Sequence, residues 1–167
     1  MKSKIISKKD LHLIGCVFYG DPFHSAKGWD TANEIGKLWK KFDELMLKNK
    51  KKIQKYLVDP DISYEVHIDP EVSKEENKWY VFVGKEVENL EVMPLQMFYK
   101  ILPKTRYAVF TSKGNNYLQA NDVIYKEWLP ESNFEESFSF QIQVFDAKRY
   151  FGLDNEESEI DFYIPIK

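Results

Sequence analysis

One order of structural elements is predicted twice along this chain, and this repetition constrains its fold more than any other feature. Residues 11–19 are rich in strand-forming residues and end at a Gly-Asp-Pro turn. Apolar residues then recur at three- and four-residue intervals between 35 and 46, which predicts a helix, and Thr31-Ala-Asn-Glu34 has the spacing of a capping box. Residues 62–68 alternate and residues 79–83 form an apolar run, so two strands should follow.

The second half has the same order. A short apolar segment at 97–101 breaks at Pro103, and a strand is predicted at 107–111. A helix is predicted from 117 to 128, ended by Pro130. The remaining segments alternate and are predicted as two strands, at 138–144 and 160–166. We therefore predict one α+β domain, residues 1–167, built from pseudo-repeats at about 11–84 and 97–167.

Strand alternation divides the side chains between the two faces of the predicted antiparallel sheet. One face is continuously apolar, and we expect two helices to cover it; it contains Ile62, Tyr64, Val66, Ile68, Phe138, Phe140, Ile142, Val144, Ile160, Phe162, Ile164 and Ile166. The other face mixes rings with polar groups; it contains Glu65, His67, Gln141, Gln143, Phe145, Asp161 and Tyr163. Such a mixture is typical of a small-molecule site, so we expect a ligand cleft on this second face. A solvated sheet face would give the same alternation.

Composition and charge exclude several other classes of function. The net charge is -3 with no basic domain, which argues against direct DNA binding. No stretch approaches the roughly 18 apolar residues of a membrane span, and no signal peptide is evident, so we expect a cytoplasmic protein without a membrane partner. Cys16 is the single cysteine and should be buried in its strand. Because His12, His24 and His67 are far apart and no nucleotide motif occurs, we expect neither a metal site nor a cofactor.

Four segments of the second half stand in a familiar order: residues 107–110 (Tyr-Ala-Val-Phe), Lys113-Gly114, 128–132 (Trp-Leu-Pro-Glu-Ser) and 159–167 (Glu-Ile-Asp-Phe-Tyr-Ile-Pro-Ile-Lys). Together they resemble the GyrI-like family, also called the effector-binding domain of AraC- and MerR-type transcription activators. The first half resembles the family more loosely. The resemblance implies a duplicated fold with a ligand cleft on its pseudo-two-fold axis, and functions in multidrug recognition and transcription regulation. We expect a stand-alone member without a helix-turn-helix of its own.

Ligands of the family are typically aromatic, hydrophobic and often cationic, and they are held by tyrosines and a buried glutamate. The resemblance places Gln143 at the glutamate position and Phe145 at the following aromatic position. It also places Tyr107 and Tyr163 at tyrosine positions that line the cleft. Because an amide attracts a cation much less than a carboxylate does, the resemblance implies a less cation-selective cleft.

Two other residues could supply the missing charge. The internal repeat gives Glu65 the position in the first half that Gln143 has in the second, and Asp161 lies on the same predicted face. We also expect Trp39 and Trp128, which lie on helix stripes that face the sheet, to pack in the core.

The function predicted from the sequence is binding of a small hydrophobic aromatic molecule, including cationic drugs, by a sensor or a sequestering module. One alternative is inhibition of a protein partner such as gyrase through the acidic surface. Acidic residues are interspersed with apolar ones or confined to short loops, which favours the cleft. A further alternative is hydrolysis of electrophilic hydrophobic drugs, for which Glu65 and Tyr107 are the candidate residues.

Overall fold

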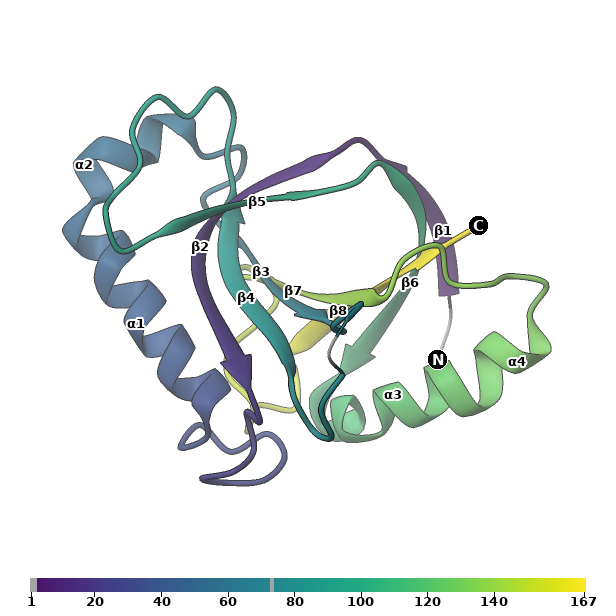
Figure 1. Ribbon diagram of the computed structural model, residues 1–167. Helices are drawn as coiled ribbons and strands as arrows, with labels where there is room; N and C mark the ends of the chain where they lie inside the picture. Colours follow the sequence, from purple (N-terminus) through teal and green to yellow (C-terminus); the bar gives the residue numbers. More distant parts are fainter. Residues whose placement is uncertain (1–2, 73) are drawn as a thin grey trace.

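The computed structural model describes residues 3–72 and 74–167 and contains one eight-stranded sheet in the order β1-β6-β8-β7-β3-β4-β2-β5 (Figure 1). The strands are β1 (Ser3–Lys8), β2 (Leu11–Gly20), β3 (Ile62–Ile68), β4 (Trp79–Glu86), β5 (Phe98–Leu102), β6 (Thr105–Lys113), β7 (Phe140–Asp146) and β8 (Glu159–Ile166). The helical segments are α1 (Glu34–Lys48), α2 (Lys50–Ile53), η1 (Gln54–Tyr56), η2 (Gly114–Gln119), α3 (Ala120–Asp122), η3 (Val123–Trp128) and α4 (Leu129–Glu131). All neighbouring strands are antiparallel, so the predicted α+β class with an antiparallel sheet is confirmed.

The strand order is symmetric about the contact between β3 and β7. Outward from this contact, β4 and β2 follow on one side, and β8 and β6 follow on the other. The short strands β1 and β5 each pair with the half to which they do not belong in sequence, β1 with β6 and β5 with β2. Residues at the β3–β7 contact therefore come from equivalent positions of two similar halves.

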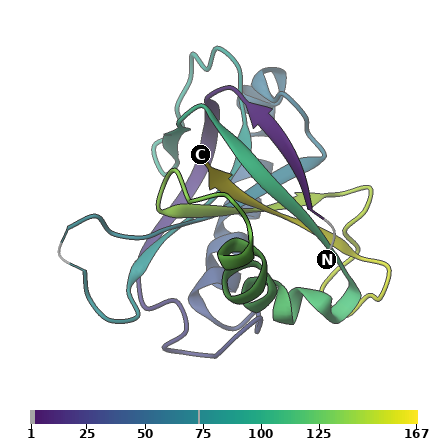
Figure 2. The ribbon, with the colours of Figure 1, turned by 90° about the vertical axis from the view of Figure 1, so that its right-hand side faces the viewer.

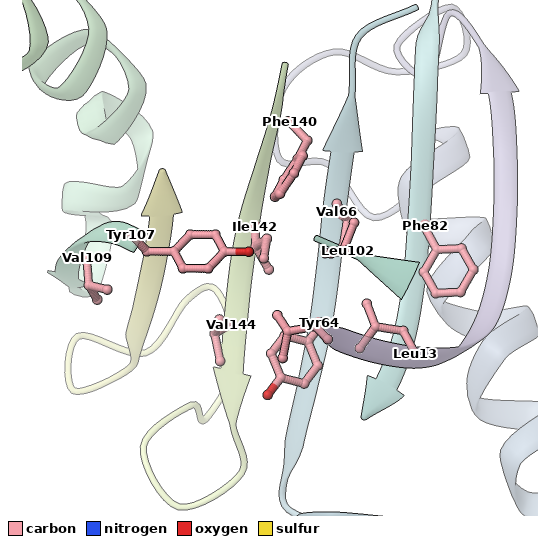
Figure 3. Packing of buried hydrophobic residues seen from close by; sticks show 11 residues of the cluster. Leu13, Tyr64, Val66, Phe82, Leu102, Tyr107, Val109, Phe140, Ile142 and Val144 are labelled. Carbon is pink, nitrogen blue, oxygen red and sulfur yellow. The ribbon is translucent and has the colours of Figure 1, made fainter. Parts of the chain in front are cut away.

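The sheet curls strongly, and the helices lie outside the curl (Figures 1 and 2). Helix α1 packs on β2 and β4 through Leu38, Phe42 and Leu45, and the helical segment 114–131 packs on β6 and β8 through Tyr117, Ala120 and Ile124. The inner face of the curl has its own core (Figure 3), formed by Leu11, Leu13, Tyr64, Val66, Phe82, Leu102, Tyr107, Val109, Phe140, Ile142 and Val144. Because each helix covers only the outer strands of its half, the outer face of β3 and β7 is left between them.

The predicted assignment of sheet faces is therefore wrong for β3 and β7. Tyr64 and Val66, like Ile142 and Val144, lie in the inner core rather than under the helices. The assignment is correct for β8, where Ile160, Phe162, Ile164 and Ile166 pack with the second helical segment. The physical reason is the curl, which brings the two halves of the inner face into contact, so that a continuously apolar strand face is buried without a helix.

The start of α1 also differs from the prediction. The N-cap is Asn33 rather than Thr31: its side chain accepts a hydrogen bond from the Gly36 N–H at 3.0 Å and donates one to the Gly28 carbonyl at 2.8 Å. Asn33 is 2% exposed. The cap therefore fixes both the helix and the preceding loop, which lines the cavity described below.

The second helix is longer and less regular than predicted. It begins at Gly114 with 3₁₀ turns, contains a π-helical turn at Val123–Trp128 and ends at Glu131, three residues beyond the predicted end. Pro130 lies in the first turn of α4 and does not end the helix. The wide π-helical turn just before it changes the backbone spacing where a proline ring would clash with a regular α-helix.

Two further expectations were that Cys16 is buried in its strand and that the chain has no membrane-spanning stretch. Cys16 is 1% exposed, as predicted, and burial raises the pKa of its thiol. In the described part of the chain, no helix has both the length and the apolar character needed to cross a bilayer.

Candidate functional site

A cavity of about 870 Å³ lies between the two helical segments, over the outer face of β3 and β7. One wall is formed by α1 and by the loop before it, and the other by the second helical segment and the chain on either side of β7. The floor consists of the outward-facing strand residues Ser63, Glu65, His67, Gln141, Gln143 and Phe145. The cleft predicted on the face away from the helices is thus on the same face as the helices, between them.

The floor residues form cross-strand pairs. Glu65 lies directly opposite Gln143, and His67 lies directly opposite Gln141. Directly opposed residues on one face of an antiparallel pair have Cβ atoms about 5 Å apart, so one small ligand group can contact both members of a pair. The β3–β7 register thus places four polar side chains together at the centre of the cavity.

A chain of hydrogen bonds holds Glu65 in place. The indole N–H of Trp39 donates to Glu65 Oε2 at 2.5 Å, and His67 Nε2 lies 2.7 Å from Glu65 Oε1. The indole N–H of Trp79 donates to His67 Nδ1 at 3.2 Å. Because Nδ1 accepts a hydrogen bond, it carries no proton, and Nε2 is the protonated nitrogen that donates to Glu65. The imidazole is therefore neutral, and both oxygens of Glu65 act as acceptors, as in a carboxylate.

The charge of Glu65 has no cationic partner in this arrangement. Glu65 is 4% exposed, and among residues 3–72 and 74–167 its ion-pair partner by distance is the neutral His67. At the end of the cavity near the start of β3 the situation is different, because the Lys85 ammonium lies close to Asp43 and Asp61. Burial lowers the pKa of Lys85, and these carboxylates oppose the shift. The centre of the cavity is negative, whereas this end has a compensating cation.

Three aromatic rings of the cavity lining pack against one another near Glu65. Trp39 and Tyr150 both pack edge-on against Phe145, with ring centroids 5.2 Å and 4.9 Å from it. Burial raises the pKa of Tyr150 to about 12, and the nearby Tyr117 and Glu65 contribute to the shift. Aromatic faces around an anionic group form a favourable environment for an organic cation.

The opposite end of the cavity holds two more carboxylates, Asp69 and Glu136, with Tyr125 beside them. Partial burial raises the pKa of Glu136; Asp69 adds to the shift, and a hydrogen bond with the Tyr125 hydroxyl opposes it. Burial also raises the pKa of Tyr125. Asp69 and Glu136 are both exposed, which places them at the mouth of the cavity.

The structure brings together four of the seven residues predicted for the site. Glu65, His67, Gln143 and Phe145 line the cavity. The other three lie on the inner side of the sheet: Tyr107, Tyr163 and Asp161. Their placement on the cavity face was wrong, because Asp161 and Tyr163 lie beside Val144 and Ile142 on the inner face of the sheet, whereas Glu65 faces outward.

These three residues have structural surroundings of their own. The rings of Tyr107 and Tyr163 are 5.7 Å apart in the inner core, where Tyr107 is fully buried. Asp161 accepts hydrogen bonds from the Thr111 hydroxyl and from Arg149 Nη2, both at 2.6 Å. Tyr107 and Glu65 are on opposite faces, so they cannot act together on one ligand, as the hydrolytic alternative required.

Sequence reasoning missed Trp39 and Tyr150 as cavity residues. Trp39 was expected to pack in the core, and it does contact both outer clusters, but its indole N–H also reaches Glu65. Helical spacing reveals which face of a helix is buried and gives no information about where an indole N–H points. Tyr150 follows β7 in a turn, for which the sequence contains no periodic signal. The expectation for Trp128 is confirmed, since its ring packs edge-on against Phe110 with centroids 4.9 Å apart.

Gln143 and Gln141 each have a side-chain oxygen without a hydrogen-bond partner among the described residues. Gln143 is 3% exposed, and the Oε1 atoms of both residues are buried. An unpaired buried acceptor is costly, and a ligand N–H donor that reached this oxygen would reduce the cost. The amide oxygens of the floor are therefore free to accept hydrogen bonds from a ligand.

Two helices that flank a polar cavity on a symmetric antiparallel sheet define the GyrI-like effector-binding class of fold. The chain belongs to the Cass2 family of integron-associated effector-binding proteins, whose pattern matches residues 4–166. The resemblance noted in the sequence is thereby confirmed.

Individual relatives agree with this assignment. The transcriptional regulator BrlR of Pseudomonas aeruginosa is 27% identical over 172 residues, which cover 99% of this chain and 56% of BrlR, so the chain spans about half the length of this relative. The structure of SAV2435 bound to tetraphenylphosphonium is similar with a TM-score of 0.70 at 13% identity, covering 100% of this chain and 94% of that one. The EcmrR C-terminal domain gives a TM-score of 0.67 at 12% identity, covering 99% and 97%. At identities of 13% and 12%, the similarity to these two structures shows a shared fold and nothing more.

Proposed function

We propose that this chain binds a hydrophobic aromatic molecule with a positive charge in the cavity between its two helical segments, and that it acts as a sensor or a sequestering module. The observation that carries the proposal is Glu65: it is 4% exposed, it is held by two N–H donors, and no Lys or Arg of residues 3–72 and 74–167 forms an ion pair with it. Gln143, at the position of the usual family glutamate, leaves this role to the carboxylate on the opposite strand.

The energetics favour a charged ligand. Removing a carboxylate from water is costly, and hydrogen bonds from neutral donors recover only part of that cost. An organic cation would add Coulomb attraction at low effective dielectric and would contact the rings of Trp39, Phe145 and Tyr150. A cavity of about 870 Å³ lies in the range typical of small-molecule sites.

The relatives support this proposal without identifying the ligand. SAV2435 has been solved with tetraphenylphosphonium, which is a lipophilic cation, and BrlR is a transcriptional regulator. Regulation of transcription by this chain would require DNA binding by another polypeptide or another segment, since its net charge of -3 does not favour DNA contacts.

The test compares tetraphenylphosphonium with tetraphenylborate, an anion of almost the same size and shape. Trp29, Trp39 and Trp79 line the cavity, so their fluorescence should report binding. We expect saturable quenching by the cation and none by the anion. Glu65→Gln should weaken cation binding about tenfold or more, because it removes a desolvated charge.

Glu86→Gln is the matched control. This carboxylate accepts a hydrogen bond from the Tyr64 hydroxyl on the inner face, and its removal changes the net charge by the same amount. Cation affinity should stay unchanged in this variant. Equal affinity for the cation and the anion, or normal cation binding by Glu65→Gln, would refute the proposed function.

A further inference from the structure

The cavity contains a second negative region that the central carboxylate does not explain. Asp69 and Glu136 lie at its mouth, and Asp69 is close enough to raise the pKa of Glu136. In the described part of the chain, no Lys or Arg forms an ion pair with either residue. At the other end, by contrast, Asp61 pairs with Lys148 at 2.8 Å and lies near Lys85. Among the described residues, the carboxylates at the centre of the cavity and at the end with Asp69 and Glu136 are thus without a Lys or Arg ion-pair partner.

The strand geometry sets the spacing of these two regions. Asp69 continues β3, because its N–H donates to the Ser139 carbonyl at 3.0 Å and extends the ladder with the chain before β7. Glu65 and Asp69 are four residues apart and therefore point to the same side, with Cα atoms about 13 Å apart. The two negative regions lie along one line on the cavity floor.

Opposite Glu65 and His67, the floor has two amide oxygens that lack a hydrogen-bond partner among the described residues. Gln143 is 3% exposed with an unpaired Oε1, and Gln141, opposite His67, also has an unpaired Oε1. Unpaired acceptors of this kind favour a ligand that carries N–H donors. The unpaired amide oxygens are an observation separate from the charges, and they lie on the same part of the floor.

From the spacing of these groups we infer that the cavity selects elongated dications, with one positively charged amine at Glu65 and the other between Asp69 and Glu136. The inference rests on the proposed function, since it assigns the ligand class of the same site. The charges of such a ligand are separated by about 9 to 14 Å, and its ends carry N–H groups. A ligand with a single charge would occupy the centre and leave the second region unfilled.

The experiment uses N,N′-dibenzyl-α,ω-diaminoalkanes with spacers of about four to about twelve methylenes, and N-benzylalkylamines of matched length as the monocations. Calorimetric titration of the wild-type chain should show an affinity maximum at an intermediate spacer. At that maximum the dication should bind about tenfold or more tightly than its monocation, because the second contact becomes intramolecular.

In the variant Asp69→Asn/Glu136→Gln this advantage should disappear, so that the dication and its monocation bind with affinities within about twofold of each other. The control Glu131→Gln/Glu135→Gln removes the same charge from exposed residues outside the cavity, and it should behave as wild type. Equal affinity for dication and monocation, or an advantage that survives in the first variant, would overturn the inference while leaving the proposed function standing. If neither compound bound, the proposed function would fail and the inference with it.

Discussion

Glu65 and Gln143 lie directly opposite each other on β3 and β7, where the two halves of the sheet meet. One member of the pair is a carboxylate with a hydrogen bond to each oxygen, and the other is an amide with an unpaired oxygen. The two opposed positions thus differ in charge. Glu65 is an acid and Gln143 is a neutral amide, so the pair brings one negative charge to the centre of the cavity.

Gln143→Glu tests this asymmetry. A second carboxylate opposite Glu65 should lower the free energy of unfolding of the unliganded protein by about 1 kcal/mol at neutral pH, since like charges in directly opposed positions repel. The same change should strengthen binding of tetraphenylphosphonium. Urea denaturation and fluorescence titration would measure the two effects. Gln143→Leu, which removes the unpaired oxygen, should not lower stability; unchanged stability and affinity in Gln143→Glu would contradict the assigned location of the site.

Much of the sheet was predictable from alternation alone. The bounds predicted for β3 are those observed, and Glu65 lies directly opposite Gln143 on the neighbouring strand. Alternation cannot show which face a helix covers, because both faces of β3 are buried, one by the cavity walls and one by the curl. The curl depends on long-range contacts such as that between Tyr107 and Phe140, whose ring centroids are 6.4 Å apart. No local pattern encodes such a contact.

The start of α1 provides a second example, and it can be tested directly. The spacing from Thr31 to Glu34 matches a capping box, yet Asn33 forms the cap because its side chain can bond both Gly36 and Gly28. Asn33→Ala should lower the free energy of unfolding by about 1 kcal/mol. Thr31→Ala should have almost no effect, since Thr31 is exposed. Equal losses in urea denaturation of the two variants would mean that the cap is assigned to the wrong residue.

The cap also positions a wall of the cavity, and Asn33→Asp separates its two roles. An aspartate keeps the acceptor for the Gly36 N–H but has no N–H for the Gly28 carbonyl. We therefore expect stability closer to wild type than in Asn33→Ala, together with weaker binding of tetraphenylphosphonium. Affinity equal to wild type would show that the hydrogen bond to Gly28 does not shape the site.

Trp39→Phe isolates the indole hydrogen bond to Glu65. The substitution keeps an aromatic ring but leaves Glu65 Oε2 without its donor, which should cost about 1 to 3 kcal/mol of unfolding free energy. Trp128→Phe is the control for lost ring volume, because its indole packs on Phe110 and Phe134 and forms no hydrogen bond in the described part of the chain. Chemical denaturation should show the larger loss in Trp39→Phe. A larger loss in Trp128→Phe would argue against an energetic role for the Trp39–Glu65 bond.

Tyr150 predicts a specific loss of stability at high pH. Its pKa is raised from 10.0 to about 12, mainly by burial in the cavity wall. Between these two pH values the unfolded chain releases the Tyr150 proton while the folded chain retains it, so the free energy of unfolding falls as the pH rises.

Tyr150→Phe removes this contribution. Urea denaturation at several pH values should show no change in the difference between variant and wild type up to about pH 9, and a growing advantage for the variant from about pH 10 to about pH 12. Tyr80→Phe, at an exposed position, should follow the wild-type curve throughout. If Tyr150→Phe also followed that curve, the phenol would not be held in its neutral form by the cavity wall beside Glu65.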